Sequence, residues 1–287
     1  MALIWSDECD KAAGEPPDSS KWTRRTGGRW GNGRELQQYT ARESNAVHDG
    51  QGNLVITARR ETYTGSDGVR RDYTSARLDT QGKFAVVKGY VEVVAKVGLT
   101  QGAFPAIWTL GGDPNRWPAG GELDILECTD ARLVARQTVH GPPSNWTVGW
   151  SGPGAINLPT ISTDFHAYGV YFDEREIQFY IDREPTMRVA RGNRPDGEWP
   201  WGRVPQWLLL NYAIGHAAGD PGPGTWPQAL TVQSVRVYDA VPSETPAPPV
   251  EPPPPPPEPP LDLAGIRADL LSASSAVEAA IRKLAGA

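Results

Sequence analysis

The chain has 287 residues, with 28 Lys and Arg against 34 Asp and Glu, a net charge of −6. This balance gives no basic stripe for a phosphate backbone, so we expect no nucleic-acid ligand. No run approaches the about 18 apolar residues of a membrane span, so no membrane span is expected. Cys9 and Cys128 are too few for a disulfide framework and are interpreted as reduced core thiols.

Residues 1–241 predict an all-β domain. Period-two stretches rich in β-branched and aromatic residues lie between turn signals, and they indicate strands near 53–58, 90–96, 167–172, 176–181 and 230–238. Many short strands with alternating faces predict a sandwich of two sheets. No alternation of strands with helices and no 20 to 50 residue repeat is visible, which disfavours a Rossmann domain, a TIM barrel or a solenoid.

One hexapeptide, Glu-Leu-Asp-Ile-Leu-Glu from Glu122, mixes carboxylates with apolar residues. On a strand Glu122 and Asp124 share a face, but Glu127 has the wrong parity. A bulge near Ile125 and Leu126 would bring all three carboxylates to one side. Like charges in a row raise at least one pKa, which suits the acid and the nucleophile of glycosidic-bond cleavage. The alternative is a solvent-facing edge strand or a calcium-binding carboxylate cluster.

Tryptophans lie around this hexapeptide and in turn-like segments. Trp108 and Trp117 precede it, and others occur at Trp30, Trp146, Trp150, Trp199 and Trp201. Flat apolar rings beside carboxylates are a common way to hold sugars. A single such tryptophan is more often a core residue, but several around an acidic strand favour a carbohydrate cleft.

The hexapeptide resembles the Glu-x-Asp-x-x-Glu motif of glycoside hydrolase family 16, in the bulged form of its laminarinase-like, endo-β-1,3-glucanase members. Further matches follow in the family's order, from Trp-Ser-Asp-Glu at 5–8 through Glu-Leu-Gln-Gln-Tyr-Thr at 35–40 to Val-Arg-Val-Tyr at 235–238. The resemblance covers about residues 4–239. It implies a concanavalin A-like β-jelly roll whose concave sheet forms an open polysaccharide cleft.

By position in the motif, the resemblance implies that Glu122 is the nucleophile and Glu127 the general acid/base. Asp124 would lie between them and tune the ionisation of Glu122. The sugar-facing positions of the family are matched by Asn32, Arg77, Phe104, Trp108, Trp117, His140 and Asn211. Phe104 stands where the family usually has Trp, so we expect a smaller stacking platform there. His140 could instead be a core histidine, and Arg77 and Asn211 could be local structural hydrogen-bonders.

We expect no required cofactor and no catalytic metal. Gln233 stands where many family members carry an Asp that helps to bind a structural calcium ion. Glu8 is then the one candidate calcium ligand, which is a thin basis for a site that needs several oxygens.

A change of composition divides the chain near residue 241. Residues 242–260 hold 12 of the 28 prolines and predict an extended linker. Residues 261–287 predict an α-helix, because Leu263, Leu270, Val277 and Leu284 fall seven apart. The helix is either a lone amphipathic segment or a short coiled coil that makes a homo-oligomer.

The sequence therefore predicts a retaining endo-glycosidase whose polysaccharide substrate is a β-1,3-glucan of the laminarin type. Alternatives are a galactan-type hydrolase of the same family and a non-catalytic carbohydrate-binding protein on this fold. The N-terminus lacks the features of a signal peptide. Because a polysaccharide hydrolase acts outside the cell, the tail and the missing signal motivate the hypothesis of a phage particle component.

Overall fold

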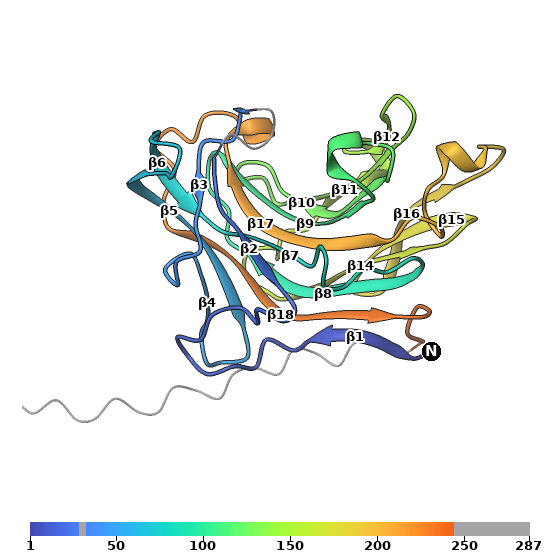
Figure 1. The fold of residues 1–287 in the computed structure, drawn as a ribbon, viewed down its shortest axis with the longest axis horizontal. Coiled ribbons are helices and arrows are strands. Elements are labelled where there is room, and N and C mark those ends of the chain that lie inside the picture. The colour runs from blue at the N-terminus through green and yellow to red at the C-terminus, as the bar shows by residue number, and fades with distance from the viewer. Residues whose placement is uncertain (29–32, 244–287) are drawn as a thin grey trace, which may run out of the picture. The chain divides into compact units, whose positions relative to one another are not determined.

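Two β-sheets stack face to face in the part of the chain that the computed structural model describes, residues 1–28 and 33–243 (Figure 1). The ten-stranded sheet contains β1 (Leu3–Asp7), β3 (Gln38–Tyr39), β4 (Ala46–His48), β5 (Leu54–Thr64), β6 (Arg70–Ser75), β8 (Gly89–Val97), β14 (His166–Phe172), β15 (Glu176–Ile181), β16 (Glu184–Ala190) and β18 (Gln228–Tyr238). The eight-stranded sheet contains β2 (Thr23–Arg25), β7 (Arg77–Asp79), β9 (Ala103–Gly111), β10 (Glu122–Glu127), β11 (Val134–Gly141), β12 (Trp146–Gly149), β13 (Ala155–Asn157) and β17 (Gln206–Ile214). Short 3₁₀ helices lie in the connections: η1 (Pro114–Arg116), η2 (Gly152–Gly154), η3 (Asp196–Glu198) and η4 (His216–Ala218).

The strand order places the acidic strand in the middle of its sheet. The eight-stranded sheet runs β12-β11-β10-β9-β17-β7-β2, with β13 paired to β11. The larger sheet runs β16-β15-β14-β8-β18-β5-β6-β3, with β1 on β18 and β4 on β5. The pairings are antiparallel except that of β3 with β6. The all-β sandwich predicted from the sequence is confirmed.

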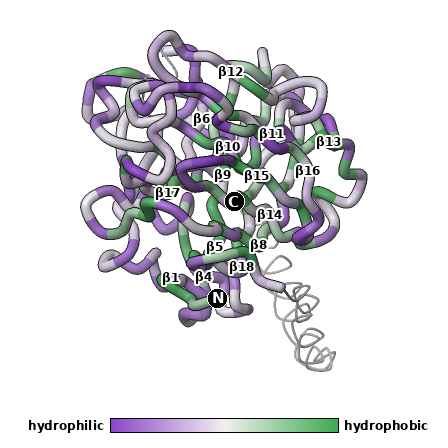
Figure 2. Tube along the Cα trace, turned by 90° about the vertical axis from the view of Figure 1, so that its right-hand side faces the viewer, coloured by the Kyte–Doolittle hydropathy of each residue, from purple (hydrophilic) through white to green (hydrophobic). Residues whose placement is uncertain are grey.

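Alternation of side chains along the strands builds the core between the sheets. In β5, Leu54, Ile56 and Ala58 are fully buried, while the residues between them are partly exposed. Figure 2 shows hydrophobic residues gathered along the central strands and hydrophilic residues in many of the outer loops. The five stretches predicted as strands coincide with β5, β8, β14, β15 and β18. The period-two pattern was therefore a sound guide to where the strands lie.

The predicted linker and C-terminal helix lie outside the described residues, apart from Pro242 and Ser243. Both stay predictions. Within residues 1–28 and 33–243, no helix is long and apolar enough to cross a membrane.

A buried ion pair fastens the edge of the eight-stranded sheet. Asp79 of β7 is 1% exposed, and the guanidinium of Arg25 in β2 donates to both its carboxylate oxygens, at 2.5 and 3.0 Å. Arg25 also donates to Gln81 Oε1 at 2.8 Å. Because a buried carboxylate is costly without a cation, this contact holds β2 against β7.

We expect Arg25→Ala to lower the free energy of unfolding by about 2–3 kcal/mol, less than for a fully buried pair because the arginine is partly solvated. Arg188→Ala is the matched control, because its pair with Glu176 is exposed, and it should cost about 0–1 kcal/mol. Urea denaturation measures both. If Arg25→Ala and Arg188→Ala lower the free energy of unfolding equally, burial of Asp79 does not make its ion pair more stabilising than an exposed one.

Candidate active site

The β10 strand contains the bulge that the parity of its carboxylates predicts. Asp124 pairs with Trp108 of β9, and the next pairing joins Leu126 to Ile107. Ile125 is therefore the extra residue. The same irregularity appears toward β11, where the register shifts between Asp124 and Glu127.

This bulge sorts the side chains of β10 between two faces. Leu123, Ile125 and Leu126 are at most 1% exposed and belong to the main core. The carboxylates of β10, which are Glu122, Asp124 and Glu127, lie close enough to shift one another's ionisation. The three carboxylates therefore share the face that turns away from the core.

Two glycines fix the entry of the chain into β10. A Cβ atom on Gly120 would collide with the carbonyl oxygen of Gly111. Gly121 has φ of +75°, and a Cβ atom there would lie 2.8 Å from the ring of Trp201. Because neither position has room for a side chain, the start of β10, and with it Glu122, has one placement.

Burial and mutual repulsion keep protons on the carboxyl groups. Burial, reinforced by the negative charge of Asp124, raises the pKa of Glu122 to about 8. Burial also raises the pKa of Glu127 well above its ordinary value, and the charges of Asp124 and Glu122 add to this. Like charges this close to one another favour the protonated forms of Glu122 and Glu127. The site therefore retains a carboxylic acid where a general acid requires one.

His140 adds a positive charge to this face. It lies opposite Glu122 in the β10–β11 pair, and its Nε2 is 3.3 Å from Asp124 Oδ2. Nδ1 lies 2.9 Å from Asn145 Oδ1, so Nδ1 is the atom that donates a proton to this amide oxygen. Burial lowers the pKa of His140, but the contact with Asp124 and the charges of Asp124 and Glu122 outweigh it and raise the pKa to about 9. His140 is accordingly a cation of the acidic site rather than a neutral core histidine.

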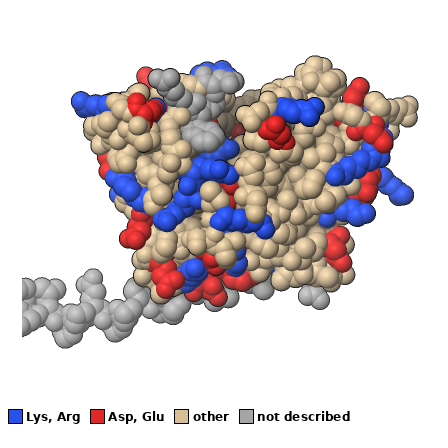
Figure 3. All heavy atoms as spheres, in the orientation of Figure 1, with Lys and Arg blue, Asp and Glu red and all other residues tan. Residues whose placement is uncertain are grey.

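Trp117 covers the Glu122 end of the site. It follows η1 and is 44% exposed, and its Nε1 donates to Glu122 Oε2 at 2.7 Å. Its ring centre lies 5.8 Å from that of His140. In the space-filling view the molecule is hollowed at its upper edge, above β9, β10 and β17 as Figure 1 orients them (Figure 3). An exposed indole at the edge of such a hollow suits a sugar ring.

A chain of hydrogen bonds fixes Trp108 on the other side of β10. Its Nε1 donates to Asn211 Oδ1 at 2.7 Å, and Asn211 Nδ2 donates to the hydroxyl of Tyr39 at 3.2 Å. The Tyr39 hydroxyl in turn donates to Glu35 Oε2 at 3.1 Å. The guanidinium of Arg77 lies 4.8 Å from the centre of the Trp108 ring. Asn211 thus acts as a structural hydrogen-bonder that orients Trp108, the second of the two interpretations left open for it.

Phe104 differs from the stacking platform expected at its position. The residue is 9% exposed, and the ring of His216 stacks on it at 5.4 Å with an interplanar angle of 1°. The imidazole covers one face of the phenyl ring, so Phe104 supports a neighbouring ring instead of presenting an open surface. Asn32, the remaining predicted sugar-binding residue, lies outside the described residues.

Five residues that contact or lie opposite predicted site residues were not themselves named as site residues from the sequence, although Trp150 was among the tryptophans that favoured a carbohydrate cleft. They are Glu35, Tyr39, Arg136, Trp150 and His216. Glu35 and Tyr39 lie in the segment 35–40 that resembles the family, which was a usable signal. The position of Arg136 opposite Glu127 depends on the β10–β11 register, which the sequence does not reveal.

The described residues contain one grouping whose ligand atoms could reach a common metal ion, Glu122, Asp124 and His140. Within this grouping, His140 Nε2 lies 3.3 Å from Asp124 Oδ2, and Glu122 Oε2 accepts from Trp117 Nε1 at 2.7 Å. Glu8, the candidate calcium ligand, accepts instead from Arg236, with Nη2 at 2.6 Å and Nε at 3.1 Å from its oxygens. Its carboxylate already has a cation.

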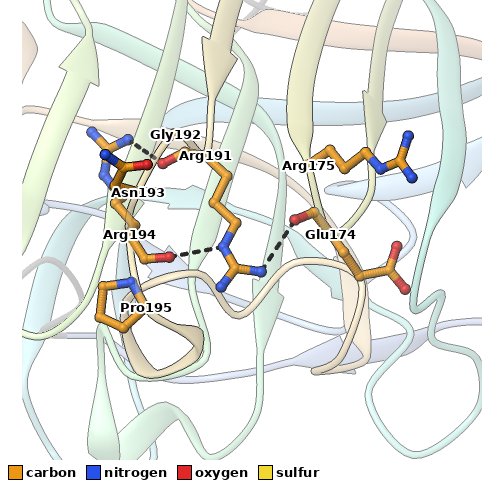
Figure 4. Close-up of a pocket in the computed structure, with 7 residues that line it drawn as sticks. All are labelled: Glu174, Arg175, Arg191, Gly192, Asn193, Arg194 and Pro195. Atoms are coloured by element: carbon orange, nitrogen blue, oxygen red, sulfur yellow. Dashed lines mark hydrogen bonds between the residues drawn. The ribbon is translucent and has the colours of Figure 1, made fainter.

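A second hollow, of about 590 Å³, lies between the β14–β15 turn and the loop after β16 (Figure 4). Its lining is basic, with Arg175, Arg191 and Arg194, and the Arg191 Nε donates to the Arg194 carbonyl at 2.8 Å. Glu174 is the one carboxylate in this lining. A hollow without a second carboxylate cannot supply an acid–nucleophile pair, so the chemistry belongs to β10.

Replacing Trp117 tests the electrostatics of this site. Trp117→Phe removes the N–H that favours the charged form of Glu122, so the pKa of Glu122 should rise further. Carbon-13 NMR titration of the glutamate carboxyl groups measures this change. Trp5→Phe is the control. It makes the same substitution at a tryptophan that stacks on Phe84 instead of donating to Glu122, so the pKa of Glu122 should not change. An unchanged or lowered pKa of Glu122 in Trp117→Phe would contradict the assignment.

The comparisons with known proteins agree with this geometry. The sequence profile described as Glycosyl hydrolases family 16 matches residues 34–226. The chain is 38% identical over 253 residues to the "Beta-glucanase" of Rhodothermus marinus, covering 82% of this chain and 84% of that protein. The solved structure of the laminarinase from Rhodothermus marinus aligns with a TM-score of 0.72 at 36% identity, over 82% of this chain and 96% of the other. A "Keratan-sulfate endo-1,4-beta-galactosidase" of Sphingobacterium multivorum is 32% identical over 82% of this chain and 54% of its own length. The family profile matches most of the chain, and the chain is 38% identical to a beta-glucanase over 84% of that protein's length. These two findings show that the chain belongs to glycosyl hydrolase family 16.

Proposed function

We propose that this glycoside hydrolase cleaves internal β-1,3 linkages of a laminarin-type glucan with retention of anomeric configuration. The substrate is supported by similarity to a protein named beta-glucanase and to the solved structure of a laminarinase, both from Rhodothermus marinus. The observation that carries the proposal is the Ile125 bulge, which places Glu122, Asp124 and Glu127 on one face.

Glu122 and Glu127, the two outer carboxyls, have different roles in the reaction. Glu122 attacks the anomeric carbon while the bond to the glycosidic oxygen breaks, and Glu127 gives its proton to that oxygen. The result is a covalent ester between the sugar and Glu122. Water then attacks the anomeric carbon and gives a proton to Glu127 as the ester bond breaks. Two successive inversions retain the configuration.

Their surroundings support these roles. The raised pKa of Glu127 favours its protonated form, which a general acid requires. The positive charge of Arg136 lowers the pKa of Glu127 and so limits this rise. Glu122 has to be ionised when it attacks, although its pKa is about 8. We infer that Glu122 loses its proton before it attacks, and that the Trp117 N–H and the positive charge of His140 stabilise the resulting charge on Glu122.

A galactan is the second candidate substrate. The observation that favours it is the identity to a relative named for galactosidase activity. The family's carboxylates perform the same chemistry on either sugar, so the substrate depends on the walls of the cleft. A non-catalytic carbohydrate-binding role has less support, because all three carboxylates are present and close together.

The tail beyond residue 241 is proposed to hold the catalytic domain on a proline-rich spacer and to oligomerise through its heptad pattern. Light scattering of the full chain and of a chain ending at Val241 tests this. A monomer in both cases would exclude oligomerisation through the helix.

Activity measurements on laminarin test the catalytic roles. We expect Glu127→Gln to lower kcat by about 10²–10⁴-fold, the usual contribution of a general acid. Glu122→Gln should lose at least as much, because no ester can form. Glu174→Gln, outside the cleft, is the matched control and should stay near the wild-type rate. Reducing-sugar release measures all three rates.

Products distinguish the substrates and the stereochemistry. Barley glucan, agarose and arabinogalactan are compared with laminarin, and proton NMR records the first anomer that is released. We expect oligosaccharides from laminarin with the β-anomer formed first. If oligosaccharides are released only from agarose or arabinogalactan, the substrate is a galactan and not a glucan. If the protein binds these polysaccharides but releases no oligosaccharide, the proposal that it is an enzyme is overturned.

A further inference from the structure

A small apolar cluster on the cleft side of the eight-stranded sheet has no part in the mechanism above. It contains Phe104, Ala213 and Ala218, with Trp150 packed against them, and it is separate from the main core. The ring of His216 stacks on Phe104, as described above. We call these five residues the Phe104 cluster.

Two members of the Phe104 cluster have an unfavourable backbone conformation. Trp150 and His216 both have φ of 52°, in the left-handed region that large side chains rarely adopt. Such strain persists where the surroundings impose it, and it is concentrated at functional sites. Both rings meet the same phenyl ring, since Trp150 contacts Phe104 edge-on at 6.5 Å and 82°. The unfavourable backbone conformations of Trp150 and His216 thus bring both of their rings into contact with Phe104.

Arg136 links this cluster to the proposed acid. It lies directly opposite Glu127 in the β10–β11 pair. Its guanidinium lies 5.0 Å from the centre of the Trp150 ring and donates to the Trp150 carbonyl. Side chains directly opposite each other on one face of an antiparallel pair are neighbours. The cation and the indole therefore lie beside the carboxyl that serves the leaving group.

Position along the strands separates this region from the Trp108 network. Trp108 pairs with Asp124, whereas Phe104 lies on the same strand β9, two residues beyond the Ala106 that pairs with Glu127. On β11, Arg136 lies opposite Glu127, so the cluster and Arg136 both lie at the Glu127 end of the site. Displacement at the anomeric carbon puts the leaving oxygen away from Glu122 and beside Glu127. The sugar whose oxygen receives the proton of Glu127 would then lie over Arg136 and Trp150.

We propose that His216, Trp150 and Arg136 bind the sugar on the leaving-group side of the scissile bond, with Phe104 as the support beneath. This inference rests on the proposed function. The same site receives an acceptor sugar after the first step. The acceptor hydroxyl oxygen then bonds to the anomeric carbon while the Glu122 ester breaks, and its proton goes to Glu127. The site therefore raises transfer to sugars relative to hydrolysis.

Two substrates separate this role from a general effect on structure. Laminarihexaose places a sugar on the leaving-group side, whereas laminaribiosyl fluoride releases only fluoride and needs no sugar there. The measured quantity is kcat/KM for the hexaose divided by kcat/KM for the fluoride. His216→Asn and Trp150→Asn keep residues that tolerate the left-handed backbone but remove the rings.

We expect this ratio to fall about tenfold in each Asn variant, which is the upper end of what one lost ring contact costs. His216→Phe keeps a flat ring and should stay within about threefold of the wild-type ratio. The yield of longer products from the fluoride with added laminaribiose should fall in the Asn variants. Glu174→Gln, remote from the cleft, controls for unspecific change.

The outcomes separate the two proposals. An active wild type whose ratio and transfer yield are unchanged in His216→Asn and Trp150→Asn overturns the leaving-side site and leaves the proposed function intact. Equal losses on both substrates, with an unchanged ratio, identify a structural role and overturn it as well. A wild type that cleaves neither substrate overturns the proposed function, and the inference with it.

Discussion

One extra residue in a single strand determines the chemistry of this protein. Regular pleating would turn Glu127 to the side opposite Glu122, into a core that contains Leu123 and Leu126. The Ile125 bulge removes this conflict, because Ile125 and Leu126 both enter the core and Glu127 comes round to the cleft. The bulge is stabilised by the apolar residues that it buries. The core and the site are therefore two results of one register shift.

Electrostatic repulsion is what the fold has to overcome to keep three carboxyls together. The positive groups around them do this unequally, with His140 beside Asp124 and Arg136 opposite Glu127. Trp117 adds an N–H at Glu122. Because each carboxyl has a different neighbour, the three need not share one ionisation behaviour, and a protonated acid can exist beside an ionised nucleophile.

The sequence was informative wherever one residue's chemistry or one strand's periodicity was enough. The strands near β5, β8 and β18 follow from alternation, and the bulge follows from the parity of Glu122 and Glu127. Contacts between distant segments could not be predicted in this way. The stacking of His216 on Phe104 joins residues over 100 positions apart, and it reverses the role expected of Phe104. The partners of Asn211 likewise become visible only once β17 lies beside β9.

The separation of the Phe104 cluster from the main core has an evolutionary consequence. Changes in Trp150 or His216 leave the packing between the sheets untouched, because neither residue belongs to the core between them. Selection can therefore alter this wall of the cleft at little cost in folding, whereas Ile125 and Leu126 are constrained by both packing and catalysis. A library at positions 150 and 216, limited to residues that tolerate a φ of 52°, would sample new acceptors on an intact scaffold.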